Sequence, residues 1–458
     1  RMYGLTFSSV EGNTSNYESE NNNTLATADP ATLGTIISGQ VASSTDHDYY
    51  SVVLGGTGVL NIAFDPSNSF DYSQSRFSIA VFDSDGLLLA NQQASIDRTF
   101  QVGVNTAGAY YVEVSGGSNS VYDTGTYGLT LNAAAGNPTK FESESNNSLA
   151  TADSLNNNTP ISGQLSSNSD VDVFRFSAEV AGYVEIQFSS PTHASAYLDS
   201  QHAYYFNVTV LNEFGTLLAN YETSGQSSFF VGLPNSGDYV VAVSSAQLYD
   251  SGTYGVSATP IVDVSEHFES ENNNTLFQAD PVSLNSTIYG QTYSTSDHDF
   301  YSVTIDATGI LSVAFDSPED LDLTIPLFTV SVFDSDGLLL ANHEASNDRV
   351  FQFGVNTVGI YYIEVSTANL CDTGLYGLTL TSVAGSTVNY ESESNNTLAT
   401  ADVATLGTTM SGQIASATDH DYYSVVLGGT GILNVAFDPS NSFDYSQSRF
   451  SIAVFDSD

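Results

Sequence analysis

"FESENNNTLFQAD", residues 268–280, places two glutamates and three consecutive asparagines just ahead of a stretch with the pattern of a folded domain. The same phrase begins at three other residues, as YESENNNTLATAD at Tyr17, FESESNNSLATAD at Phe141 and YESESNNTLATAD at Tyr390. Successive copies lie 124, 127 and 122 residues apart. A period of this length belongs to a whole domain and not to a solenoid coil, so this acidic phrase predicts a tandem array of domains.

The residues at which the repeats match one another predict the domain boundaries. Residues 2–19 match residues 375–392, and residues 18–85 are identical to residues 391–458 at 60 of 68 positions. We therefore expect the natural polypeptide to continue on both sides of this sequence. The predicted segments are a closing strand and linker of a preceding repeat at 1–16, complete repeats at 17–136, 137–262 and 263–385, and the first part of a fourth repeat at 386–458.

Alternation of apolar and polar residues predicts half-buried strands within each repeat. In the first repeat it is clear in VLNIAFD (59–65), RFSIAVFD (76–83) and AYYVEVS (109–115). Further strands fit residues 36–41, 48–54, 86–91, 99–104 and 125–131, and the one helical signal is a turn near residues 24–28. Short strands divided by Gly, Asn, Asp and Ser turns predict an all-β protein of tandem antiparallel β-sandwich domains joined by short linkers.

Composition limits the classes of partner. The chain has 7 Lys+Arg against 52 Asp+Glu, a net charge of -45, which argues against nucleic acid or an anionic membrane surface and favours divalent cations. The 27 Tyr and 26 Phe supply the cores of several domains. The lone Cys371 provides no internal disulfide, and the abundance of Ser, Thr and Asn with little Lys is typical of an exported bacterial surface protein. No apolar run has the length of a membrane span.

The acidic phrase has the ligand chemistry of a calcium site. Its second, fourth, sixth and seventh residues carry side-chain oxygens, and alternate residues of an extended segment point the same way, so Glu18, Glu20 and Asn22 converge. Calcium takes six to eight oxygen ligands from carboxylates, amides and the backbone. The alternative interpretation is a solvated linker followed by an Asn/Thr cap.

A pair of aspartates follows about 28 residues after the first glutamate of each phrase, in DHDYY, DVDVF, DHDFY and DHDYY. Like charges two residues apart at the start of a strand are costly unless a positive charge lies between them. The intervening histidine is dispensable, because the second repeat has Val171 in its place.

Two other acidic motifs have simpler explanations. In FDSDGLLLAN (82–91) the second repeat keeps Gly215 but replaces the second aspartate by Phe214, so we expect a glycine hairpin and not a calcium loop. Asp123, Asp250 and Asp372 each precede a Thr-Gly or Ser-Gly pair, where an Asx turn is favoured and an additional metal ligand is the alternative. We found no recurring nucleophile, base and orienting group, so the sequence predicts a non-enzymatic segment.

Together, E-x-E-x-N-N, a G-x-[VIL] strand, D-x-D-x-[FY], the glycine hairpin and a closing G-x-Y-G-[LV] resemble the bacterial pre-peptidase C-terminal (PPC) domain, a family that is similar to the collagen-binding domains of collagenases. The resemblance implies secreted, jelly-roll-like β-sandwiches that often bind Ca²⁺ and accompany peptidases. Its calcium ligands would fall on Glu18, Glu20, Asn22, Asn23, Asp46, Asp48, Glu142, Glu144, Asn146, Asn147, Asp170, Asp172, Glu269, Glu271, Asn273, Asn274, Asp297, Asp299, Glu391, Glu393, Asn395, Asn396, Asp419 and Asp421.

One departure from the family bears on the number of ions. The family motif often ends in Asp where this chain has Asn23 and its counterparts, so one or two ions per repeat stay open.

The leading functional hypothesis is a non-enzymatic, calcium-binding repeat region of an extracellular or cell-surface bacterial protein, namely a stalk, adhesin or fibre. The alternative is the substrate-binding accessory region of a large secreted peptidase or other hydrolase. Self-association into a filament through strand edges, or an extracellular protein or polysaccharide ligand, stays open as a further partner.

Overall fold

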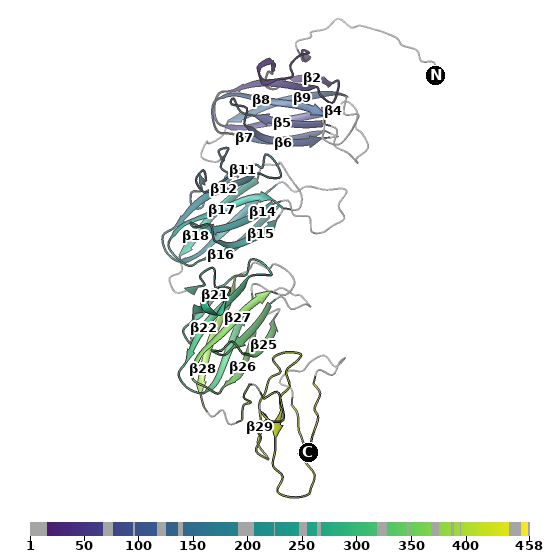
Figure 1. The fold of residues 1–458 in the computed structure, drawn as a ribbon. Helices are drawn as coiled ribbons and strands as arrows, with labels where there is room; N and C mark the ends of the chain where they lie inside the picture. Colours follow the sequence, from purple (N-terminus) through teal and green to yellow (C-terminus); the bar gives the residue numbers. More distant parts are fainter. Residues whose placement is uncertain are drawn as a thin grey trace, which may run out of the picture.

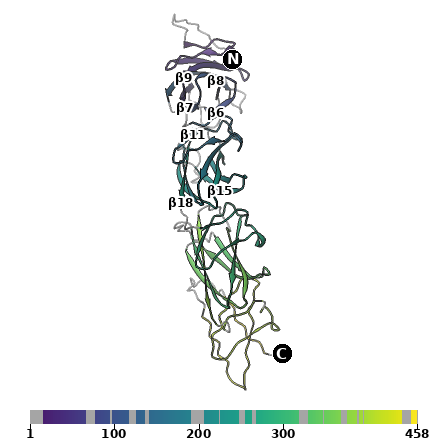
Figure 2. The same ribbon diagram turned by 90° about the vertical axis from the view of Figure 1, so that its left-hand side faces the viewer.

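The computed structural model describes residues 16–66, 77–94, 97–116, 125–135, 141–190, 206–223, 225–246, 254–262, 267–317, 328–345, 348–367, 375–385, 389–393, 395–438 and 450–456. Three β-sandwiches follow one another along an elongated molecule, and two views at right angles show the same end-to-end row (Figure 1, Figure 2). Among the described residues, no helix has the length and apolar character needed to cross a membrane.

The first sandwich packs a five-stranded sheet against a four-stranded one. The larger sheet has the order β1-β3-β8-β5-β6 and the smaller one β2-β9-β4-β7. The strands are β1 (Asp29–Pro30), β2 (Ile36–Val41), β3 (His47–Leu54), β4 (Gly58–Pro66), β5 (Phe77–Phe82), β6 (Leu88–Ala94), β7 (Arg98–Val104), β8 (Gly108–Gly116) and β9 (Gly125–Ala135).

The second sandwich repeats this arrangement, and in the third β19 adds a fifth strand to the smaller sheet. Their strands are β10 (Asp153–Ser154), β11 (Ile161–Gly163), β12 (Val171–Ala178), β13 (Gly182–Ser189), β14 (Phe206–Asn212), β15 (Leu217–Thr223), β16 (Gln226–Leu233), β17 (Gly237–Ser245), β18 (Tyr254–Val262), β19 (His267–Phe268), β20 (Asp280–Pro281), β21 (Thr287–Gly290), β22 (His298–Ile305), β23 (Gly309–Asp316), β24 (Phe328–Phe333), β25 (Leu339–Ala345), β26 (Arg349–Val355), β27 (Gly359–Thr367) and β28 (Tyr376–Ala384).

The apolar and polar residues that alternate in the sequence are the buried and the less buried residues of the strands. Along β4, Leu60, Ile62 and Phe64 are buried while the residues between them are half-buried. These side chains join those of the opposite sheet in one core per sandwich. The predicted all-β sandwich fold is therefore confirmed, including the short helical turn, which is a 3-10 helix at Leu25–Thr27.

The predicted glycine hairpin is also confirmed. It joins β5 to β6, and Gly86 adopts a φ of 82°, which favours glycine. The carboxylate of Asp83 accepts backbone hydrogen bonds from Asp85 and Leu87, both at 2.9 Å. Because Gly86 lies in the turn, β6 begins two residues later than predicted.

Short parallel pairs are a feature that the antiparallel prediction missed. At one end of the acidic phrase Tyr17 bridges Ser38 of the smaller sheet, and at the other end β1 pairs in parallel with Tyr50 and Ser51 of the larger sheet. The phrase thus crosses from one sheet to the other at one end of the sandwich. Apolar alternation does not report strand direction, so the sequence could not predict these pairs.

The described part of the fourth repeat has the same two parallel contacts, the bridge of Tyr390 to Ser411 and the pairing of β29 (Asp402–Val403) with β30 (Tyr423–Ser424). Val435 and Phe437, the counterparts of the core residues Ile62 and Phe64 in β4, are exposed. By alignment with the first repeat, the strands that would pair here correspond to residues after 85 and are not in this sequence. The predicted closing strand within 1–16, the three Gly-adjacent aspartates Asp123, Asp250 and Asp372, and Cys371 lie outside the described residues.

Candidate metal centre

The last residue of the acidic phrase shapes the loop. In the third repeat the carboxylate of Asp280 accepts hydrogen bonds from the backbone NH of Ser270 at 2.6 Å and from its hydroxyl at 2.7 Å. The side-chain NH₂ of Asn273 also points to Asp280, at 3.4 Å. The same NH₂ group also donates to Oε2 of Glu269 at 3.2 Å, and the side-chain oxygen of Asn273 is buried without a hydrogen-bond partner.

The first glutamate of the phrase is anchored at both of its oxygens. Oε1 of Glu269 accepts the backbone NH of Gln291 at 2.5 Å, and Oε2 accepts the hydroxyl of Tyr301 at 2.5 Å. Glu269 is buried at the junction of the phrase with β21. Its orientation is therefore fixed by the sandwich itself.

The two aspartates are held by a turn and by the closing strand. Oδ2 of Asp297 accepts the backbone NH of Tyr293 at 2.8 Å, which closes the turn before β22. Oδ2 of Asp299 accepts the hydroxyl of Tyr376, on β28, at 2.6 Å. That hydroxyl is also 2.6 Å from the hydroxyl of Tyr301, so one tyrosine pair connects Asp299 to the first glutamate.

These contacts bring three carboxylates together. Oxygens of Glu269, Glu271 and Asp299 all lie within 4.8 Å of one another, as do those of Glu142, Glu144 and Asp172 in the second repeat. These two groups, which we call the closed triads, can each hold a metal ion. The sequence predicted all six residues as ligands, and the structure assembles them from the phrase and from the start of β12 or β22.

Buried oxygens without hydrogen-bond partners surround the closed triads. Buried polar atoms are nearly always paired, so such a group of unpaired oxygens at one place calls for a ligand. All of them are carboxylate or amide oxygens, the donor set that hard cations such as Ca²⁺ prefer. They belong to Glu144, Asn146, Asp172, Glu271, Asn273, Asp297 and Asp299.

Burial without a countercharge perturbs the pKa values of the same groups. Desolvation, and then repulsion from Asp297 and Asp299, raises the pKa of Glu271 to about 9. Desolvation, and then repulsion from neighbouring aspartates, raises the pKa of Glu144 to about 8. Without a cation these centres therefore retain protons at neutral pH, because gathered negative charges oppose one another in a buried site.

The first and fourth repeats do not form a closed triad within the described residues. In the first repeat Asn22, Asp46 and Asp48 are buried, but Glu18 is only half-buried and Glu20 is exposed. In the fourth repeat Asn395 is buried, whereas the half-buried carboxylates are those of Glu391, Glu393, Asp419 and Asp421.

The last asparagine of the phrase has a structural contact. The side-chain oxygen of Asn274 accepts the backbone NH of His298 at 2.8 Å, and Asn23 and Asn396 make the same contact with His47 and His420. This bond ties the phrase to the aspartate pair. The ligand role of these residues and of Asn147 stays a prediction. The ring of His298 itself pairs with Glu364 at 2.7 Å.

Sequence reasoning missed the supporting residues. These are the phrase-ending aspartates Asp29, Asp153, Asp280 and Asp402, which accept the serine hydrogen bonds, and the tyrosines that hold the acids. Both had a signal: the aspartate ends every copy of the phrase, and Tyr127, Tyr254 and Tyr376 are the tyrosines of the closing G-x-Y-G motif.

Comparison with known proteins gives the following similarities. No family model and no curated protein matches this chain. Among solved structures, it is similar to the pre-peptidase C-terminal domain of a collagenase from Bacillus anthracis, at 20% identity over 22% of this chain and 93% of that one, with a TM-score of 0.19. It is also similar to tandem CBM51 modules of a family 98 glycoside hydrolase from Streptococcus pneumoniae, at 10% identity over 47% and 81% of the two chains, with a TM-score of 0.17.

A third similar structure is the M60 catalytic domain with two CBM51 domains from Clostridium perfringens, at 9% identity over 73% of this chain and 55% of that one, with a TM-score of 0.17. Likenesses of this size establish neither a family nor a function. The functional assignment below therefore depends on the residues of this chain.

Proposed function

We propose that this chain is a non-enzymatic, calcium-binding repeat region of a secreted or cell-surface bacterial protein, in which ions stiffen a row of β-sandwiches into a stalk, adhesin or fibre. The observation that carries the proposal is the set of unpaired, buried oxygens around each closed triad. Calcium would be held by Glu271, Asn273 and Asp299 with Asp297 and Glu269, and by their counterparts in the second repeat. It would supply the positive charge that the gathered carboxylates lack.

The place of the triads supports a mechanical role. Each one lies where the chain leaves one sandwich and enters the next, since the acidic phrase is the first part of every repeat. An ion that bridges the phrase to the aspartate pair therefore fixes the entry of the chain into its sandwich. The end-to-end row of sandwiches favours a spacer or fibre over a single accessory module (Figure 1).

The test is a calcium titration of the whole chain. Chelator should lower the melting temperature and change the small-angle scattering profile, because the joints between sandwiches loosen. Calcium should restore both. Binding to the native state alone stabilises it by about 2.7 kcal/mol at a free concentration 100 times the Kd. Identical melting curves and scattering profiles in chelator and in calcium would contradict the proposal.

The alternative is the substrate-binding accessory region of a large secreted hydrolase. The sequence motifs that resemble the PPC domain support it, because members of that family accompany peptidases. The complete polypeptide separates the two: a catalytic domain in the same chain would favour the accessory role.

A further inference from the structure

Each closed triad has a complete sandwich before its phrase and a complete sandwich of its own. The first glutamates of the second and third repeats, Glu142 and Glu269, are 8% and 7% exposed. The first repeat has its own complete sandwich but no described one before its phrase, and its aromatic Tyr17 is 65% exposed. The fourth repeat follows a complete sandwich but has only part of its own.

In the second, third and fourth repeats, the aromatic residue next to the first glutamate packs on the preceding sandwich. Phe141 lies against Gly103 on the edge strand β7, and a Cβ placed on that glycine would be 2.8 Å from Cδ1 of the ring. Phe268 lies in the same way against Gly232 of β16, with a Cβ distance of 2.7 Å. Non-bonded carbon atoms do not approach so closely, so glycine is required for this docking.

The third joint has the same contact, because a Cβ on Gly354 of β26 would be 2.5 Å from Cβ of Tyr390. We call each such glycine with the aromatic ring over it the socket. The glycine is the next-to-last residue of its strand in all three sandwiches. A feature repeated at three joints is a property of the array and not of one interface.

Hydrogen bonds across the joint involve the residues that position the first glutamate. Gln291, 4% exposed, donates from its side chain to the carbonyl of Leu218 in the preceding sandwich at 2.5 Å. The backbone NH of the same Gln291 holds Oε1 of Glu269. At the next joint, the side chain of Asn356 donates to the carbonyl of Glu391 at 2.5 Å. The contacts of the joint and the placement of the ligand therefore share residues.

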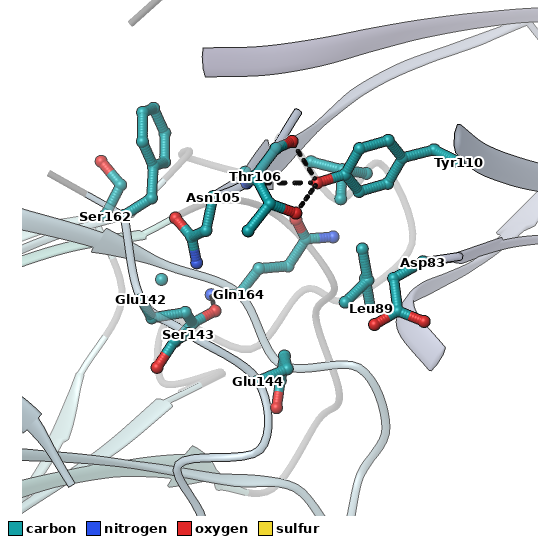
Figure 3. A pocket seen from close by; sticks show the side chains of 14 residues that line it. Asp83, Leu89, Asn105, Thr106, Tyr110, Glu142, Ser143, Glu144, Ser162 and Gln164 are labelled. Atoms are coloured by element: carbon teal, nitrogen blue, oxygen red, sulfur yellow. Dashed lines mark hydrogen bonds between the residues drawn. The ribbon is translucent and has the colours of Figure 1, made fainter. Parts of the chain in front are cut away.

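The second glutamate of each closed triad faces the joint. Glu144 lines a cavity of about 150 Å³ between the first and second sandwiches, and Glu271 lines one of about 10 Å³ between the second and third. In the larger cavity, Asp83, Leu89 and Asn105 face the phrase (Figure 3). The side chain of Gln164, a residue that is 3% exposed, has no hydrogen-bond partner there, whereas the side chain of its counterpart Gln291 donates a hydrogen bond across the smaller gap. The two joints are thus closed to different degrees.

We propose that each sandwich completes the metal site of the next: seating of the aromatic in the socket closes the triad and raises its cation affinity, and cation binding in turn tightens the joint. The proposal rests on the proposed calcium role and adds its regulation by the neighbouring repeat. The two effects are reciprocal, because a coupling free energy between two sites acts equally in both directions.

The test blocks the socket of the first joint in the full chain. Gly103→Val places a branched side chain where the ring of Phe141 lies, and Phe141→Ala removes the ring without adding bulk. Gly56→Val is the matched control, since a Cβ there meets nothing within 4 Å. The geometry of the joint is measured as the distance between nitroxide labels at Thr99→Cys and Glu179→Cys, with Cys371→Ser to remove the native cysteine. Calcium affinity is measured by titration with CaCl₂, and E271Q/D299N removes the triad of the third repeat so that the triad of the second repeat is observed.

Both socket variants should broaden the distance distribution and weaken calcium binding by the triad of the second repeat about tenfold, a typical coupling. The control variant should change neither the distance distribution nor the calcium affinity. The double variant Gly103→Val/Phe141→Ala should recover part of both properties, because the added valine fills the space that the ring vacates. A broadened joint with unchanged calcium affinity would overturn the proposal while leaving calcium binding intact. A complete lack of calcium binding by the unblocked chain would overturn the proposed function as well.

Discussion

Neutralising two carboxylates of one closed triad should abolish the calcium response of a single repeat. Glu271 and Asp299 lie in the triad of the third repeat, and both carry buried oxygens without hydrogen-bond partners. The variant E271Q/D299N keeps the shape of both side chains and removes two negative charges. The second repeat, with its own triad at Glu142, Glu144 and Asp172, is left intact.

The expected magnitude follows from binding linkage. At free calcium 100 times the Kd, the third repeat of the unaltered chain gains about 2.7 kcal/mol. One kcal/mol shifts the melting temperature of a domain of this size by about 4 °C, so the gain is about 10 °C. The variant should lose this shift. In chelator it should be at least as stable as the unaltered chain, because the amides avoid the desolvation cost and the charge repulsion that together raise the pKa of Glu271 to about 9.

Scanning calorimetry of the whole chain in chelator and in calcium measures the shift, and isothermal titration counts the sites. E344Q/D306N is the control, because it removes two exposed carboxylates of the same repeat. We expect one fewer tight site in the triad variant and an unchanged number in the control. An equal calcium-induced shift and an equal number of sites in both variants would refute the assignment of these residues as ligands.

Three further outcomes are expected. In chelator the melting temperature should fall as pH rises from 5 to 9. The pKa values of Glu144 and Glu271 are raised from 4.5 to about 8 and about 9, so the folded chain binds more protons than the unfolded chain in this pH range. A melting temperature that rises with pH would show that these two groups are ionised in the folded chain. Tyr376→Phe removes the hydroxyl that donates a hydrogen bond to Asp299 at 2.6 Å and should lower the free energy of unfolding of the third repeat by about 1–3 kcal/mol in denaturant. An unchanged free energy of unfolding would show that this hydrogen bond does not support the centre. The purified chain should hydrolyse neither peptide nor glycosidic substrates, and turnover that a point mutation in this chain abolishes would reveal an enzyme.

The supporting residues show why the site was only partly predictable. The ligand types of the acidic phrase and of the aspartate pair were evident, since carboxylates and amides recur at fixed spacing. The tyrosine that holds Asp172 is Tyr254, 82 residues away in the chain. Such a contact depends on strand pairing across the sandwich, and a local pattern carries no information about it.

The sequence by itself determined the β-sandwich class, the repeated order of strands and the candidate ligands, because apolar alternation and duplication are local properties of the chain. Only the tertiary structure decided which candidates meet. Nearly identical phrases form a closed triad in the second and third repeats and an open cluster in the first and fourth. In the closed triads the closing strand of the same sandwich brings Tyr254 or Tyr376 to the aspartate, and the aromatic of the phrase packs on a glycine of the preceding sandwich. Both contacts join residues far apart in the chain, so the phrase alone does not specify them.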